Sequence, residues 1–143
     1  MCTFVVSEKI HGGNVLASAK ILLDTDVIIE WLRNKSHITQ KIKNLIKRGA
    51  VLAWTPISVA EIYAGMRKGE EKEISNLFLV LEALSITDTI GKRAGQYLSK
   101  FSKSYGVEIA DALIAASATH YGMQLWTLNI KHYPMPDISI FKD

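Results

Sequence analysis

The sequence predicts an α/β fold in which a mostly parallel central sheet of four to five strands is flanked by helices. Short aliphatic segments alternate along the 143 residues with longer segments of helical periodicity. That order is typical of parallel strands joined by right-handed crossover helices. Polar side chains follow several of the short segments, where strands of such a sheet end. With 48% hydrophobic and 22% charged residues, the composition is that of one globular domain, which argues against disorder.

The first predicted strand is residues 21–23, an aliphatic run that indicates burial on both faces of a sheet. A helix follows, because apolar side chains recur at helical spacing: Val27, Ile28, Trp31 and Leu32. Asp24 therefore lies where a strand ends and a helix begins, at the edge where open α/β sheets bind ligands. Because it precedes the helix by one residue too many for a simple cap, we interpret Asp24 as functional. Thr25 or Asp26 could cap this helix, and for Asp26 the choice between a cap and a functional role stays open.

Residues 36–48 form an amphipathic helix with apolar positions at Ile38, Ile42, Leu45 and Ile46. Its opposite face is basic, with Lys41, Lys43, Lys47 and Arg48. We interpret this face as solvated surface, since charge alone is a weak sign of a nucleic-acid contact. Gly49 ends the helix, and residues 50–54 form a second buried strand.

The next helix is predicted over residues 58–66, and it carries the third acidic position of interest. Ser58 and Glu61 have the spacing of a capping box, which alone would explain Glu61. The alternative is that Glu61, one turn into a helix that leaves the second strand, faces the same edge of the sheet as Asp24.

A basic turn, suited to contacts with phosphate through Arg67 and Lys68, leads into a helix over residues 70–84. The apolar stripe of this helix is Ile74, Leu77, Phe78, Leu81 and Leu84. A weak third strand over residues 84–87 is followed by a helix over residues 88–104, capped at its start by Thr87 or Asp88.

Residues 109–121 form a helix that is small and apolar around most of its circumference, which predicts close packing inside the domain. Asp111 is the exception, and an unpartnered buried carboxylate costs several kcal/mol. Asp111 is therefore a helix cap, an ion-pair partner or a metal ligand, and its apolar surroundings favour the ligand. A fourth strand over residues 124–127 leads to Asn129, and residues 138–141 form a short last strand.

The remaining features narrow the class of protein. The formal charge of +3 is a mild bias toward a polyanionic partner. The single cysteine, Cys2, excludes an internal disulfide and a thiolate zinc site. No apolar run could span a bilayer, and residues 1–20 lack the pattern of a signal peptide, so we expect a cytoplasmic protein. We assign residues 1–20 to an extension of unknown role, with a short strand at 3–6 and a turn at 11–14.

Four side chains lie at, or one turn beyond, predicted strand ends or helix starts: Asp24, Glu61, Asp111 and Asn129. In a parallel sheet these ends share one edge, so we expect the four to converge. Clustered carboxylates repel one another unless a cation is present. Oxygen ligands select Mg²⁺ or Mn²⁺, and such ions activate water for phosphodiester hydrolysis. The sequence therefore predicts a metal-dependent hydrolase of phosphodiesters.

Four segments in order resemble the motifs of PIN-domain nucleases, most closely the VapC-type toxins of toxin–antitoxin systems. The segments are residues 23–28 (LDTDVI), 58–65 (SVAEIYAG), 111–116 (DALIAA) and 127–133 (TLNIKHY). Each is weak alone, but their order and spacing over about residues 21–141 are specific. The resemblance implies a three-layer α/β/α PIN-like fold within a nuclease domain at residues 21–143.

The resemblance also implies a Mg²⁺-dependent endoribonuclease, with Mn²⁺ as a substitute. Asp24 and Asp111 would bind the metal directly, and Glu61 would complete the acidic site directly or through water. Asn129 matches a position where the family carries Asp or Asn, and Thr127 and Asp26 match polar positions that orient ligands or water. The implied partners are an RNA substrate, a VapB-type antitoxin and a second copy of the chain in a homodimer, with no membrane.

Two alternatives use the same residues. An aliphatic strand followed by Asp24-Thr25-Asp26 also resembles the first motif of haloacid-dehalogenase-type phosphatases, in which Asp24 would be a nucleophile. That family needs a later acid pair, and residues 127–133 supply Lys131 without one. The second alternative is a non-catalytic PIN-like module that binds RNA or protein, which the retained acidic side chains argue against.

Overall fold

The computed structural model describes residues 18–142, which build a sheet of four parallel strands. The strands are β1 (Lys20–Leu23), β2 (Val51–Trp54), β3 (Glu82–Ala83) and β4 (Gln124–Trp126). Their order across the sheet is β3-β2-β1-β4, so β1 is an inner strand with a partner on either side. Its register pairs Leu22 with Ala53 of β2 and Leu125 of β4.

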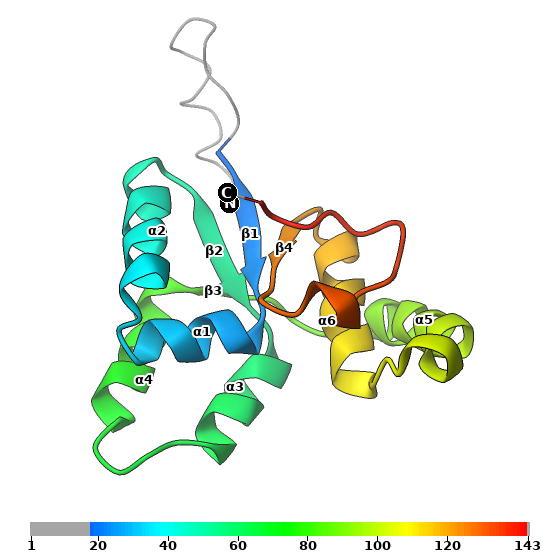
Figure 1. Cartoon of the computed structure of the whole chain (residues 1–143), viewed down its shortest axis with the longest axis horizontal. Helices are drawn as coiled ribbons and strands as arrows, with labels where there is room; N and C mark the ends of the chain where they lie inside the picture. The colour runs from blue at the N-terminus through cyan, green and yellow to red at the C-terminus, as the bar shows by residue number, and fades with distance from the viewer. Residues whose placement is uncertain (1–17, 143) are drawn as a thin grey trace, which may run out of the picture.

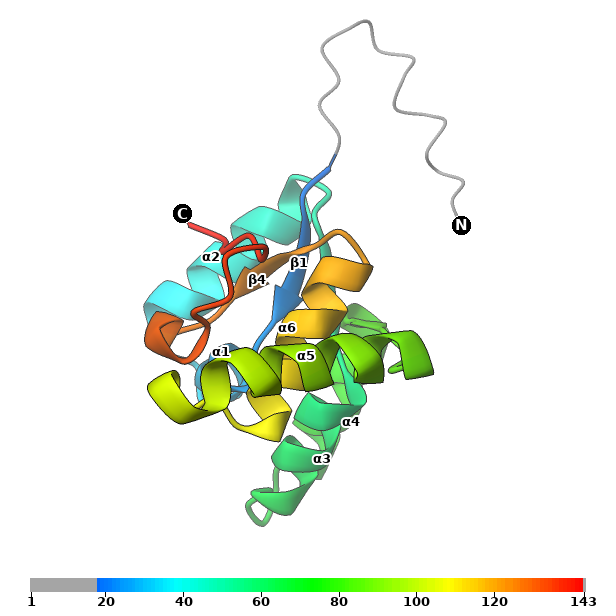
Figure 2. The same cartoon turned by 90° about the vertical axis from the view of Figure 1, so that its right-hand side faces the viewer.

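Helices cover both faces of this sheet, which confirms the expected three-layer α/β/α fold (Figure 1). One layer contains α1 (Thr25–Leu32), α2 (Ser36–Lys47), α3 (Pro56–Ala64) and α4 (Glu71–Val80). The other contains α5 (Asp88–Tyr105) and α6 (Ile109–His120). Figure 2 shows α5 lying across α6 on the outer side of that layer. A short 3-10 helix, η2 (Ile130–His132), follows β4.

Successive residues of β1 enter different hydrophobic cores, as the period of two along a strand requires. Ile21 and Leu23 pack with α1 to α4, whereas Leu22 packs with α5 and α6. All three side chains are fully buried. The prediction of a strand buried on both faces is therefore confirmed, and it explains why residues 21–23 are aliphatic without interruption.

Several predicted boundaries are wrong because tertiary pairing overrides local pattern. The third strand is Glu82–Ala83, where Ala53 pairs with Glu82 and Trp54 with Ala83, so α4 ends at Val80 rather than at residue 84. The last predicted strand, residues 138–141, is reduced to one isolated parallel bridge between Leu125 and Ile140.

Other corrections concern single side chains. The third helix begins at Pro56, and Thr55 caps it by accepting a hydrogen bond from the Ile57 N–H at 3.2 Å. Ser58 therefore lies inside the helix, which excludes the capping box and leaves the other interpretation of Glu61. Ile46 and Phe78, both expected to point inward, are exposed.

The predicted strand at residues 3–6 and turn at residues 11–14 lie outside the described residues, as does Cys2. Within residues 18–142, no helix combines the length and apolarity that a transmembrane span requires.

The two isoleucines of α2 provide a test of the layer packing. Ile42 is 1% exposed and Ile46, one turn later, is 45% exposed. We expect Ile42→Ala to lower the free energy of unfolding by about 2–5 kcal/mol, because it leaves a cavity in the core. Ile46→Ala should change it by less than about 0.5 kcal/mol. Urea unfolding followed by circular dichroism measures both, and equal losses would contradict this placement of α2.

Candidate acidic site at the carboxyl edge of the sheet

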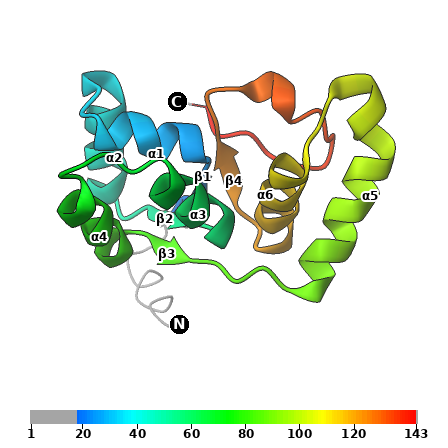
Figure 3. The same cartoon turned by 90° about the horizontal axis from the view of Figure 1, so that it is seen from below.

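The carboxyl ends of the strands meet the starts of α1, α3 and α6 at one edge of the molecule. Figure 1 shows β1 running toward this edge, and Figure 3 shows the three helices around the ends of β1 and β4. A cavity of about 300 Å³ opens here. Its lining residues are Asp24, Thr25, Asp26, Ile29, Glu61, Ala110, Asp111, Ile114, Asn129 and His132. The structure thus brings together the four side chains that the sequence analysis expected to converge.

Asp24 joins β1 to α1, and its backbone N–H donates to the Trp126 carbonyl of β4 at 2.9 Å. Contrary to the expectation from the sequence, Asp24 is itself the N-cap of α1: its Oδ1 accepts from the Thr25 N–H at 2.8 Å. The reason is that α1 begins directly at Thr25, so neither Thr25 nor Asp26 is the cap. The Asp24 side chain is nevertheless at the cavity, so capping and a functional role are compatible.

The second oxygen of Asp24 accepts two side-chain hydrogen bonds. Thr127 Oγ1 and the Tyr133 hydroxyl each donate to Oδ2 at 2.8 Å. Burial and the nearby Asp24 carboxylate raise the pKa of the Tyr133 phenol far above its usual value, so the phenol keeps its proton and remains a donor. Thr127 in turn accepts from the Asn129 N–H at 3.0 Å, which links the loop after β4 to Asp24.

Glu61 reaches the site through a chain of hydroxyl groups. The Thr25 hydroxyl donates to Glu61 Oε1 at 2.6 Å. Since that bond uses the only proton of the Thr25 hydroxyl, the Ser58 hydroxyl 2.8 Å away acts as the donor to Thr25 Oγ1. Both hydroxyls are buried. The start of α1 therefore holds Glu61 of α3 toward the same cavity as Asp24.

Asp111 lines the cavity and also takes part in a capping box at the start of α6. The sequence analysis favoured a ligand over a cap, but the structure shows a capping box in which Asp111 Oδ2 accepts from the Glu108 N–H at 3.2 Å. The expected apolar surroundings apply to the rest of α6, while Asp111 itself is half-buried because it faces the cavity. Burial and the charge of Asp24 raise its pKa, while the Glu108 N–H and His132 oppose the shift.

Asp26 lies on the rim of the site and holds the loop after β4. Its two oxygens accept from the Leu128 N–H at 3.3 and 3.1 Å, and the Asn129 side-chain amide lies 3.4 Å from Oδ2. Burial, followed by the charge of Asp24, raises the pKa of Asp26 to about 6. In this site the ionised form of Asp26 is therefore less stable than it would be in water.

The donor set suits a hard divalent cation. No three His, Cys, Asp or Glu side chains within residues 18–142 stand ready to hold one metal ion together. Mg²⁺, however, keeps several of its waters and needs only one or two carboxylates. Oxygens that take part in no hydrogen bond between described residues remain at the cavity: Glu61 Oε2, Asp111 Oδ1 and the side-chain amide oxygen of Asn129. These residues fit a partly hydrated Mg²⁺ or Mn²⁺ ion.

Sequence reasoning missed four contributors to the site: Thr25, Ser58, His132 and Tyr133. Thr25 and Ser58 lie close to Asp24 and Glu61 in the sequence, but their hydrogen bond to each other joins two helices, and Tyr133 meets Asp24 only in the folded chain, so spacing did not identify these contacts. His132 also lines the cavity, and its electrostatic interaction with Asp111 lowers the pKa of that carboxyl, against the larger effect of burial.

Comparisons with known proteins agree with this geometry. The PIN domain family model matches residues 21–135. Ribonuclease VapC10 of Mycobacterium tuberculosis is 35% identical over 116 residues, which cover 80% of this chain and 86% of the relative. Ribonuclease VapC19 of the same organism is 29% identical over 119 residues, which cover 82% and 95%.

Solved structures show the same fold. VapBC2 from Rickettsia felis, bound to a DNA fragment from its promoter, aligns with a TM-score of 0.72 at 21% identity, covering 85% of this chain and 97% of the other. DNA-bound VapBC from Salmonella typhimurium also aligns with a TM-score of 0.72, at 23% identity and 86% and 97% coverage. By its match to the family model and its identity to these ribonucleases, the chain belongs to the PIN-domain family and, within it, to the VapC type.

Proposed function

We propose that this protein is a metal-dependent endoribonuclease and the toxin of a VapBC-type toxin–antitoxin pair. The observation that carries the proposal is the convergence of Asp24, Glu61 and Asp111 on one cavity in a chain that matches the PIN model. The relatives named Ribonuclease VapC support RNA as the substrate. Membership of the PIN family leaves the alternative phosphatase activity without support.

Asp24 and Asp111 are the proposed direct ligands of Mg²⁺, with Mn²⁺ as a substitute, and Glu61 completes the site directly or through water. When bound, the cation supplies a water activated for attack on a phosphodiester and neutralises charge on the leaving oxygen. Thr127 holds Asp24, and Asp26 holds the Leu128 N–H and the Asn129 amide, so these two side chains keep the loop of Asn129 at the cavity. Asn129 offers a neutral oxygen there.

Three further parts of the proposal concern the setting of the enzyme. Residues 21–143 form the nuclease domain, in line with the family match over 21–135. The partner is a VapB-type antitoxin, since solved proteins of the same fold are VapBC complexes. The protein works in the cytoplasm as a homodimer.

Replacement of Asp24 or Asp111 by asparagine tests the carboxylate charge while keeping an oxygen that can accept the same backbone hydrogen bond. In Asp24→Asn the side-chain oxygen can still cap α1, because Asn caps helices as well as Asp does, and in Asp111→Asn the amide oxygen can still accept from the Glu108 N–H. The carboxylate charge is lost. We expect Mg²⁺-dependent cleavage of a labelled RNA pool to fall by more than about 100-fold, the upper range for groups that only support a ligand.

The matched control is Asp88→Asn, an exposed acid in the first turn of α5 that does not line the cavity. It should cleave like the parent protein. Cleavage that persists unchanged in both Asp24→Asn and Asp111→Asn would assign the activity to another site and overturn the proposal.

The proposed metal site also predicts a change in stability. A cation that binds only the folded state raises the unfolding free energy by about 2.7 kcal/mol at 100 times its Kd. We therefore expect Mg²⁺ or Mn²⁺ to raise the Tm, and EDTA to reverse the rise and abolish cleavage. Scanning fluorimetry of the parent and Asp24→Asn proteins measures this. A rise of equal size in both proteins would show that the ion binds elsewhere.

A further inference from the structure

The three hydrogen bonds to Asp24 distribute unequally over its two oxygens. An ionised carboxylate has about four acceptor positions, two on each oxygen. Thr127 and Tyr133 fill both positions of Oδ2, whereas Oδ1 accepts only from the Thr25 N–H. Among the described residues, one acceptor position of Asp24 therefore remains open, and it belongs to Oδ1.

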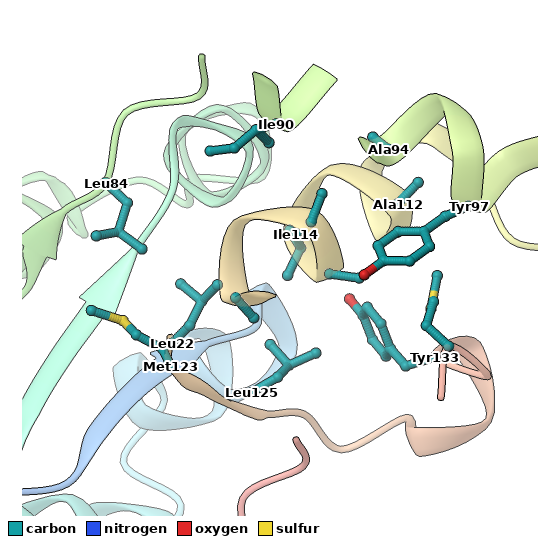
Figure 4. Packing of buried hydrophobic residues seen from close by; sticks show 14 of the residues in the cluster. Leu22, Leu84, Ile90, Ala94, Tyr97, Ala112, Ile114, Met123, Leu125 and Tyr133 are labelled. Atoms are coloured by element: carbon teal, nitrogen blue, oxygen red, sulfur yellow. The ribbon is translucent and has the colours of Figure 1, made fainter. Parts of the chain in front are cut away.

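Tyr133 makes this distribution possible from inside the core. Its side chain is 5% exposed and packs in the same cluster as Leu125 and Ile114 (Figure 4). A phenylalanine would supply the same ring packing without a hydroxyl. Burying that hydroxyl costs free energy unless it is hydrogen-bonded, and Asp24 Oδ2 is the partner that it has.

We propose that Tyr133 is a positioning residue for Asp24. Together with Thr127 it fixes Oδ2, and it thereby turns the carboxylate so that Oδ1 is the oxygen offered to a cation. Asp24 then binds through one oxygen only. This inference rests on the proposed function, in which Asp24 is a metal ligand.

The inference makes the Tyr133 hydroxyl important for metal binding as well as for packing. Hydrogen bonds to an ionised acceptor are about twice as strong as neutral ones. Without the Tyr133 hydroxyl, only the bonds from Thr25 and Thr127 would restrict rotation of the Asp24 carboxylate. Residues that support a metal ligand in this way are worth 10–100-fold in metal affinity or activity. We expect Tyr133→Phe to weaken Mn²⁺ binding about 10-fold.

Tyr97 is the matched control. It is 6% exposed, belongs to the same hydrophobic cluster, and donates its hydroxyl to a carboxylate, that of Asp137, at 2.9 Å. Figure 4 shows Tyr97 reaching this cluster from α5. Asp137 does not line the acidic cavity. Tyr97→Phe thus removes a part-buried phenol–carboxylate bond without touching Asp24, and it should leave Mn²⁺ affinity unchanged.

The experiment is titration calorimetry with Mn²⁺ on five full-length proteins: the parent, Tyr133→Phe, Tyr97→Phe, Thr127→Val and Asp24→Asn. RNA cleavage across Mn²⁺ concentrations accompanies it. We expect Tyr133→Phe to raise both the Kd and the half-saturating Mn²⁺ concentration about 10-fold, with most of the rate regained at saturation. Unchanged values in Tyr133→Phe, or equal rises in Tyr97→Phe, would overturn the positioning role.

The remaining variants keep the outcomes distinct. If the parent binds no Mn²⁺, or Asp24→Asn binds it like the parent, the proposed function fails. If Asp24→Asn loses binding while Tyr133→Phe does not, only the inference about Tyr133 fails. Should Tyr133→Phe not fold, Thr127→Val decides the matter, because it removes the other donor to the same oxygen. It should weaken Mn²⁺ binding in the same direction, and parent-like binding would contradict the inference.

Discussion

Mutual repulsion between carboxylates at one edge of a sheet is the constraint that the rest of this structure has to meet. Asp24, Asp26, Glu61 and Asp111 line one cavity. Each of them accepts hydrogen bonds from backbone N–H groups or from hydroxyl groups. These donors stabilise the charged forms, but burial and the nearby charge of Asp24 still raise the pKa of Asp26 to about 6. The hydrogen-bond donors of the protein therefore do not fully offset the negative charge of the cluster, and a cation bound there would lower the remaining repulsion.

The fold meets this constraint through β1. Because β1 pairs with β2 and β4, its end places Asp24 beside Trp126 and the loop that follows. The alternation of Ile21, Leu22 and Leu23 between the two cores fixes the register of the strand, since a slip of one residue would exchange its faces. Burial of these three side chains thus determines the position of Asp24, which directly follows Leu23 in the chain.

Local pattern was enough to predict much of this arrangement. The strand before Asp24, the helices α2, α5 and α6, and the convergence of Asp24, Glu61, Asp111 and Asn129 follow from periodicity and from the topology of parallel sheets. What failed depends on contacts between distant residues. Pairing with β2 moved the third strand to residues 82–83. The bond from Tyr133 to Asp24 joins residues 109 positions apart, so no spacing rule could identify it.

The roles of helix cap and metal ligand, which sequence reasoning treated as alternatives, are compatible at Asp24 and Asp111 for a physical reason. A cap occupies one acceptor position of a carboxylate that has about four. The N–H groups and the dipole at a helix N-terminus also stabilise negative charge, and a carboxylate must be ionised to bind a cation. Asp24 at the start of α1 and Asp111 in the first turn of α6 are therefore held and oriented by hydrogen bonds from the backbone at these helix starts. A helix that starts directly after a strand therefore supplies backbone donors that orient an acidic metal ligand at that point.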